Sequence, residues 1–367
     1  MPNTYRTTEE IFASRLDDGK LTRLQLSNMG LFASGAFSNV YKGVARSDST
    51  AAEVVIKKTW PRSKGAPLEV KILGRLNRLK HKNIVRLLYS YQKEHDGRIC
   101  LALIFEYVPL NLHQFLKQNQ RQLDIVEVKL ITWQLFRGQS HLNKNLLYNA
   151  DSGLLKISDF GSSSLEVSKS SVQPSYHVTR YYRPPELLLG SQKYGCEIDI
   201  WSCGCVLGEL LKGGVFLAGR NTANQIELIF DLLGKPSSEE LTAMKANKEK
   251  YEDTCQSYLQ GSQRKIDFSF LYNPNASTQR DRRTAVLNMA LRRQEMMDSV
   301  NVLRQVLVYD PQNRLGGVDL LMHPYFHQLF EETTVRSNGK RITCLSASDY
   351  QNAKAGDQTV TIESTDV

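Results

Sequence analysis

The sequence lacks any apolar run long enough to cross a bilayer, and its charged first segment, residues 1–20, lacks the apolar core of a signal peptide. These absences argue against a membrane-spanning or secreted protein, so we expect the chain in the cytoplasm, with the nucleus as a second location. The six cysteines show no paired spacings, which argues against a disulfide framework. Two of them, Cys203 and Cys205, lie in an apolar helical run and are predicted to be buried free thiols.

The chain also lacks a nucleic-acid-binding motif, although it is basic. Lysine and arginine number 47 against 38 acidic residues, which gives a formal net charge of +9. Basic clusters such as residues 75–82 are typical of a solvated surface, so we expect no nucleic-acid partner and no membrane partner. A nucleic-acid binder would instead need binding with a steep salt dependence.

Length and composition indicate a globular protein of ordinary kind. The chain has 367 residues, of which 41% are hydrophobic and 23% charged, and these fractions are close to the averages of such proteins. This length is sufficient for two packed lobes and a polar tail.

The stretch of residues 154–161 places an acidic side chain at the mouth of a strand. Alternating apolar residues end in Ser-Asp-Phe-Gly, so a turn there can direct Asp159 at a metal ion. A carboxylate suits Mg²⁺, which takes oxygen ligands and leaves positions for phosphate oxygens. Asp-Phe-Gly alone is a common tripeptide, but here it is followed by Pro-Pro-Glu at 184–186 and by Asp-Ile-Trp-Ser-Cys-Gly at 199–204.

This ordered set of motifs resembles that of a eukaryotic protein kinase, and the wording of residues 175–186 is similar to the glycogen synthase kinase 3 family. The resemblance covers residues 25–330. It implies an α+β, bilobal fold, with ATP and Mg²⁺ as cofactors and phosphoryl transfer to Ser or Thr of protein substrates. Protein substrates or signalling partners are the implied partners, and an ion pair between Glu186 and Arg314 is implied in the larger lobe.

The resemblance and the composition together predict four segments. They are a flexible leader or edge strand over 1–24, an N-lobe with its hinge over 25–108, a C-lobe over 109–330, and a polar, disordered tail over 331–367. The last four residues, Ser-Thr-Asp-Val, fit a motif that PDZ domains bind through strand addition, so a PDZ contact is a further expectation.

The N-lobe motifs imply the nucleotide-binding residues. Gly35 is the one glycine retained from the family's phosphate-binding loop, and Val40 follows it at the family's valine position. The family's ion pair is matched by Lys57 and Glu69, which we expect to direct the lysine at the α and β phosphates. Val55 would crowd the adenine from above.

Further positions follow from the hinge and from the metal and regulatory motifs. Backbone groups near Glu106 and Val108 are expected to meet the adenine edge, with Phe105 as gatekeeper; Leu147 is a further expected contact of the nucleotide. Asn145 and Asp159 match the two metal ligands, and Tyr176 matches a regulatory phosphotyrosine of the family.

The catalytic loop departs from the resemblance. After Gln134–Arg137 the family continues into His-Arg-Asp, whereas this chain has residues 138–144 without that motif and then Asn145. The base is therefore missing, which predicts a loss of about 10²–10⁴ in rate. His141 and Asp151 are given no catalytic role.

Two functional hypotheses remain open from the sequence. One is a pseudokinase-like regulatory or binding protein that holds Mg-ATP and transfers phosphate poorly or not at all. The other is an active serine/threonine kinase whose catalytic loop is missing from this sequence or isoform. Recognition of substrates that already carry a phosphate is expected to be lost, because Leu68 and Ser164 replace two basic residues of the family.

Overall fold

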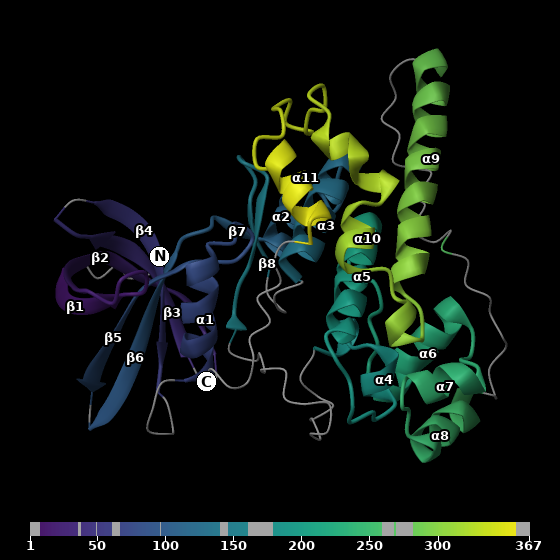
Figure 1. Ribbon diagram of the computed structural model, residues 1–367, viewed down its shortest axis with the longest axis horizontal. Coiled ribbons are helices and arrows are strands. Elements are labelled where there is room, and N and C mark those ends of the chain that lie inside the picture. Colours follow the sequence, from purple (N-terminus) through teal and green to yellow (C-terminus); the bar gives the residue numbers. More distant parts are fainter. Residues whose placement is uncertain are drawn as a thin grey trace.

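The computed structural model describes residues 8–35, 38–48, 50–60, 67–95, 97–139, 146–160, 179–258, 268 and 282–356. A β-rich lobe is followed by a larger helical lobe, and the two lie side by side in Figure 1. This arrangement confirms the predicted fold class. None of the helices in these ranges is long and apolar enough to cross a membrane.

The N-terminal lobe is a closed barrel with the strand order β1-β2-β3-β4-β6-β5. Its strands show the period of two that a half-buried strand requires, as in β4, where Val54 and Ile56 are buried between more exposed neighbours. The strands are β1 (Glu9–Arg15), β2 (Leu21–Ser34), β3 (Ser38–Arg46), β4 (Ala51–Thr59), β5 (Leu87–His95) and β6 (Arg98–Glu106).

The prediction of a flexible leader over 1–24 is wrong for the residues from Glu9 onward. There β1 pairs antiparallel with β2, and it also pairs with β5, so it is not an edge strand. Ala13 and Leu24 have exposed fractions of 0% and 1%, which places them in the barrel core. The sequence appeared polar because exposed residues alternate with these buried apolar ones. Residues 1–7 lie outside the described part.

Helix α1 (Leu68–Leu79) is the helix of the N-terminal lobe, and it carries Glu69 in its first turn. Its apolar face consists of Ile72, Leu73 and Leu76, all buried in the main hydrophobic core. The helix ends at Lys80, whose φ of 51° is the left-handed conformation that commonly terminates a helix. Burial of one face therefore fixes the direction in which Glu69 points.

The C-terminal lobe is built around α3 (Ile125–Gln139) and α5 (Glu197–Lys212), which pack against each other. Close packing around α5 depends on Gly204, where a Cβ would lie 2.7 Å from Val306 Cγ1. The other helices are α2 (Leu112–Gln118), α4 (Pro185–Leu188), α6 (Thr222–Leu233), α7 (Ser238–Ala243), α8 (Lys248–Tyr258), α9 (Arg282–Val306), α10 (Gly317–Leu321) and α11 (Ala347–Lys354).

A small sheet lies where the two lobes meet. Its order is β7 (Leu110–Asn111), β8 (Leu146–Asn149) and β9 (Leu154–Ile157), all antiparallel. It presents Leu147 and, two residues beyond β9, Asp159.

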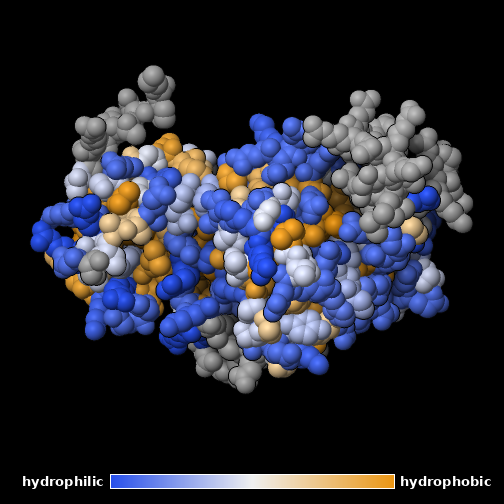
Figure 2. All heavy atoms as spheres, turned by 90° about the horizontal axis from the view of Figure 1, so that it is seen from above, coloured by the Kyte–Doolittle hydropathy of each residue, from blue (hydrophilic) through white to orange (hydrophobic). Residues whose placement is uncertain are grey.

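In the view of Figure 2 most of the described surface is hydrophilic, and apolar residues are confined to patches.

Two predicted features of the larger lobe are confirmed. Arg314 donates from both terminal nitrogens to the Glu186 carboxylate, at 2.7 Å each, and both side chains are almost fully enclosed. Cys203 and Cys205 are buried free thiols.

The prediction of a disordered tail over 331–367 is wrong for residues 331–356. This segment is ordered and attached to the domain by two sets of ion pairs. Arg336 binds the Glu127 carboxylate at 2.7 and 3.1 Å, and Asp349 of α11 pairs with Arg137 at 2.6 Å and with Lys82. The polar composition suggested a solvated tail, because charged residues usually face water. In the structure, Arg336 and Asp349 instead contact partners that are far away in the sequence. Residues 357–367, with the predicted PDZ motif, lie outside the described part.

We expect Asp349→Asn to destabilise the domain in a pH-dependent way. Burial opposes ionisation, but hydrogen bonds from Lys82, Arg137 and Ser346 outweigh it and lower the pKa of Asp349 to about 2. Because the folded-state pKa lies below the unfolded one, the carboxylate stabilises the fold above about pH 4, and this stability is lost as the pH falls toward 2. After allowance for solvent screening, the substitution should reduce the free energy of unfolding at pH 7 by about 1–2 kcal/mol.

The measurement is urea unfolding of wild type and variant at pH 7 and pH 3. The difference between the two proteins should shrink at pH 3. Asp253→Asn, at an exposed position on α8, is the matched control and should change the free energy of unfolding by less than about 0.5 kcal/mol. Equal stability of Asp349→Asn and wild type at pH 7 would contradict the attachment.

Candidate functional site

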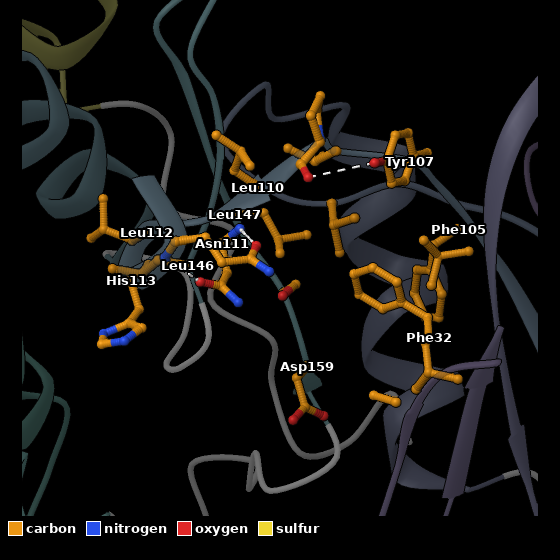
Figure 3. Close-up of a pocket in the computed structure, with 18 of the residues that line it drawn as sticks. Phe32, Phe105, Tyr107, Leu110, Asn111, Leu112, His113, Leu146, Leu147 and Asp159 are labelled. Atoms are coloured by element: carbon orange, nitrogen blue, oxygen red, sulfur yellow. Dashed lines mark hydrogen bonds between the residues drawn. The ribbon is translucent and has the colours of Figure 1, made fainter. Parts of the chain in front are cut away.

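A cavity of about 650 Å³ lies between the lobes, within the size range of small-molecule sites. Figure 3 shows Phe32 and Phe105 on one side and Leu147 on the other, with Asp159 at one end. The predicted site residues that line it are Val40, Lys57, Glu69, Glu106, Val108, Leu147 and Asp159.

Three predicted residues are not placed in the cavity wall. Gly35 is exposed at the β2–β3 turn, where its N–H donates to the Ser38 carbonyl at 2.9 Å. Among the residues that the structure describes, a Cβ there would meet only that carbonyl oxygen, at 3.7 Å. Asn145 and Tyr176 lie outside the described residues, and their roles stay predictions.

Apolar walls make one end of the cavity suitable for a planar ring. Val40 and Val55 come from neighbouring strands of the barrel, and Leu147 comes from the small sheet of the other lobe. Phe32 also lines this end, and the sequence analysis missed it. The position of Phe32 at the end of β2, beside the turn that carries Gly35, could have indicated that it lines the cavity. Aliphatic and aromatic side chains on opposite sides favour a flat ligand between them.

An ion pair attaches the hinge to the small sheet. Lys156 of β9 binds Glu106 Oε1 at 2.7 Å, and the same oxygen accepts the Arg86 N–H at 2.8 Å. The Lys156 side chain is 11% exposed, so this pair is largely shielded from water. The pair links the hinge backbone to the hairpin that carries Leu147. Sequence reasoning missed Lys156, because a single lysine in a short strand is typical of a solvated face.

Lys57 lies between two carboxylates. Its Nζ donates to both oxygens of Glu69, at 2.7 and 3.0 Å, and to Asp159 Oδ1 at 3.1 Å. Burial lowers the pKa of Lys57, but the two carboxylates outweigh burial, and the net pKa is raised. The lysine is therefore a fixed cation at the end of the cavity away from the hinge. The ion pair predicted between Lys57 and Glu69 is present.

Asp159 has an uncommon backbone conformation. Its φ of 62° lies in the left-handed region, which is uncommon for residues other than glycine. The next residue, Phe160, is 1% exposed in the main core and holds the turn in place. The Asp159 carboxylate contacts Lys57. Its side chain is also 47% exposed and lines the cavity, so a ligand in the cavity can reach it.

A divalent metal ion fits this carboxylate as one protein ligand among several oxygens. Within the described ranges, no group of three or more His, Cys, Asp or Glu side chains could hold a metal ion on its own. A single hard carboxylate at the mouth of a cavity suits an ion such as Mg²⁺, which keeps water and takes phosphate oxygens as further ligands. Asp159 would hold that ion, with Asn145 as the second predicted ligand.

The catalytic loop region is short. Helix α3 ends at Gln139 and β8 begins at Leu146, so residues 140–145 make the whole connection, and they lie outside the described part. Asp151 lies in the β8–β9 turn with a side chain that is 95% exposed, and it does not line the cavity.

Comparisons with known proteins agree with the geometry. The family model described as a protein kinase domain matches residues 26–326. The chain is 30% identical over 325 residues to a glycogen synthase kinase 3 of Trypanosoma brucei brucei, covering 83% of this chain and 84% of the relative.

Two fungal relatives are similar at the same level. The protein kinase gsk3 of Schizosaccharomyces pombe is 29% identical, covering 88% of this chain and 79% of the relative. The serine/threonine-protein kinase RIM11/MSD1 of Saccharomyces cerevisiae is 30% identical, covering 80% and 75%. With the two-lobed fold and the interlobe cavity, these similarities show that the chain belongs to the protein kinase family and has a glycogen synthase kinase 3-like serine/threonine kinase domain.

Proposed function

We propose that this chain binds Mg-ATP in the interlobe cavity. The observation that carries the proposal is the position of Lys57, which is fixed by Glu69 and Asp159 at the end of an otherwise apolar cavity. An apolar slot that ends in a cation and an accessible carboxylate is complementary to a planar base that carries phosphates and a metal ion.

Each wall of the cavity has a part in this proposal. Val40 and Leu147 would enclose the adenine, and backbone groups near Glu106 and Val108 would meet its edge. Lys57 would bind the α and β phosphates, while Asp159 and Asn145 would hold Mg²⁺. When bound, the metal ion would supply charge neutralisation at the phosphate oxygens.

We further propose that phosphoryl transfer is strongly impaired, so that the domain acts mainly as a binding or regulatory protein in signalling. A general base that orients the substrate hydroxyl contributes about 10²–10⁴ in rate. The sequence between Gln139 and Leu146 has no aspartate. In the family, an aspartate of the catalytic loop accepts the proton of the substrate hydroxyl. Protein partners are proposed, in the cytoplasm or nucleus, and a PDZ domain is proposed to bind the last four residues.

A second candidate function is an active serine/threonine kinase, either with a different base or in a form that contains the missing loop. The ion pair of Lys57 with Glu69 favours it, because a kinase that transfers phosphate depends on this pair to direct the lysine at the phosphates. The names of the relatives also favour it, since each is called a kinase. Phosphorylation of Tyr176 would regulate either form.

We expect Lys57→Met to weaken Mg-ATP binding at least about tenfold, because a charge-assisted contact with phosphate is lost. Asp159→Asn should weaken binding by a similar factor in Mg²⁺, and should match wild type in EDTA. The measurement is titration with a fluorescent ATP analogue, with folding checked by circular dichroism.

The matched control is Lys58→Met. Lys58 is the next residue of β4 and lies 5.2 Å from the ring centroid of Tyr41, away from the cavity lining. Its loss should leave the affinity unchanged. Equal affinity of wild type and Lys57→Met would refute the assignment of the phosphate site.

Insertion of a His-Arg-Asp catalytic loop between Gln139 and Asn145 should raise phosphate transfer to a generic protein substrate by about 10²–10⁴. It should also raise the melting temperature, because the inserted histidine would pack against Phe160. The control carries the same insertion with asparagine in place of aspartate, and it should gain stability without activity. Wild-type activity equal to that of the aspartate insertion would favour the active-kinase candidate instead.

A further inference from the structure

The hinge contains one irregular contact, at the end of β6. The register of β5 with β6 pairs Leu87 with Phe105, so Arg86 and Glu106 face each other as the next pair. Two residues that face each other in a hydrogen-bonded antiparallel pair normally exchange two backbone hydrogen bonds. Among the described residues only one of these bonds is present, from the Glu106 N–H to the Arg86 carbonyl oxygen at 3.1 Å.

A side chain replaces the second backbone bond. The Arg86 N–H donates to Glu106 Oε1 at 2.8 Å and not to the Glu106 carbonyl oxygen. The carboxylate thus takes the donor that would otherwise occupy the main-chain carbonyl of the same residue. A backbone carbonyl is a strong acceptor, and Glu106 lines the cavity, so its carbonyl oxygen is available to a donor on a ligand.

Lys156 holds the Glu106 carboxylate in this position. Its Nζ lies 2.7 Å from Oε1, the same oxygen that accepts the Arg86 N–H. The Lys156 side chain is 11% exposed and that of Glu106 26%, and a charge-assisted contact of this kind is stronger than one between neutral groups. Without the lysine, the carboxylate would be free to turn toward water. The Arg86 N–H would then pair with the Glu106 carbonyl oxygen, as in a regular sheet.

Val108 supplies a donor beside this acceptor. It is 8% exposed and lines the cavity, and its N–H has no acceptor in the part of the chain that the structure describes. An acceptor at Glu106 and a donor at Val108 are complementary to a purine edge on which an amino group lies next to an unprotonated ring nitrogen. Adenine has such an edge. Hypoxanthine has a carbonyl oxygen in place of the amino group, and that oxygen would face the Glu106 carbonyl oxygen.

We propose that Lys156 is a positioning residue for recognition of the nucleotide base. By holding the Glu106 carboxylate on the Arg86 N–H, it keeps the Glu106 carbonyl oxygen free for the amino group of adenine. The inference rests on the proposed binding of Mg-ATP and deepens it, because it assigns the choice of base to a residue that does not itself touch the nucleotide.

The test compares two nucleotides that differ at this position of the base, ADP and inosine diphosphate. Binding of each to the full chain is measured by isothermal titration calorimetry in Mg²⁺. Wild type should bind ADP at least about tenfold more tightly than inosine diphosphate. Lys156→Met should reduce this ratio to about threefold or less, mainly through weaker ADP binding, and Lys156→Arg should restore it. A ratio in Lys156→Met equal to that of wild type would overturn the inference alone.

A control separates positioning from general loss of stability. Lys82→Met breaks the ion pair of Lys82 with Asp349, which lies outside the cavity lining, so it should destabilise the fold and leave the ratio unchanged. An equal fall of the ratio in Lys82→Met and Lys156→Met would refute a positioning role.

A second variant decides the inference if Lys156→Met does not fold. Glu106→Ala removes the carboxylate and frees the Arg86 N–H, so it should lower the ratio in the same way; an unchanged ratio would overturn the inference. Failure of wild type to bind either nucleotide would overturn the Mg-ATP proposal and this inference with it.

Discussion

The contact of Lys57 with Glu69 and Asp159 is the interaction on which the proposed site depends. It joins β4, α1 and the segment after β9, so three elements from both lobes meet at one ammonium group. A largely buried cation of this kind is stable only with its partners, and Glu69 is the more buried of the two. The geometry of the proposed phosphate site therefore depends on how the two lobes are positioned relative to each other.

Supporting contacts hold the elements that present these three residues. The apolar face of α1 fixes the direction of Glu69, and buried Phe160 supports the strained turn at Asp159. The pair of Lys156 with Glu106 fixes the hinge against the small sheet. A site assembled from such elements is preorganised, and this reduces the entropy lost when a ligand binds.

The C-terminal segment belongs to the same structure. Arg336 reaches Glu127 of α3 and the carbonyl oxygens of Ala150 and Asp151 in the β8–β9 turn. Asp349 joins the end of α3, through Arg137, to Lys82 of the N-terminal lobe. The segment therefore stabilises α3 and the β8–β9 hairpin.

The sequence predicted the features that depend on local pattern and ordered motifs. The two-lobed fold, the pair of Glu186 with Arg314, and the meeting of Lys57 with Glu69 followed from motifs at family spacings. It did not predict contacts such as Lys156 with Glu106 or Arg336 with Glu127. Each partner by itself is typical of a solvated charge, and only the fold brings the two together. The same reason explains why residues 331–356 were expected to be disordered, whereas residues 9–24 were expected to be flexible because exposed residues alternate there with buried apolar ones.

Calorimetric titration of the full chain with a non-hydrolysable ATP analogue, in Mg²⁺ and in EDTA, decides whether the interlobe cavity is a nucleotide site. We expect one binding site per chain and tighter binding in Mg²⁺, because Asp159 and the phosphates would share the metal ion. Absence of binding in both solutions would contradict this expectation. In that case the arrangement of Lys57, Glu69 and Asp159 would serve the stability of the fold alone.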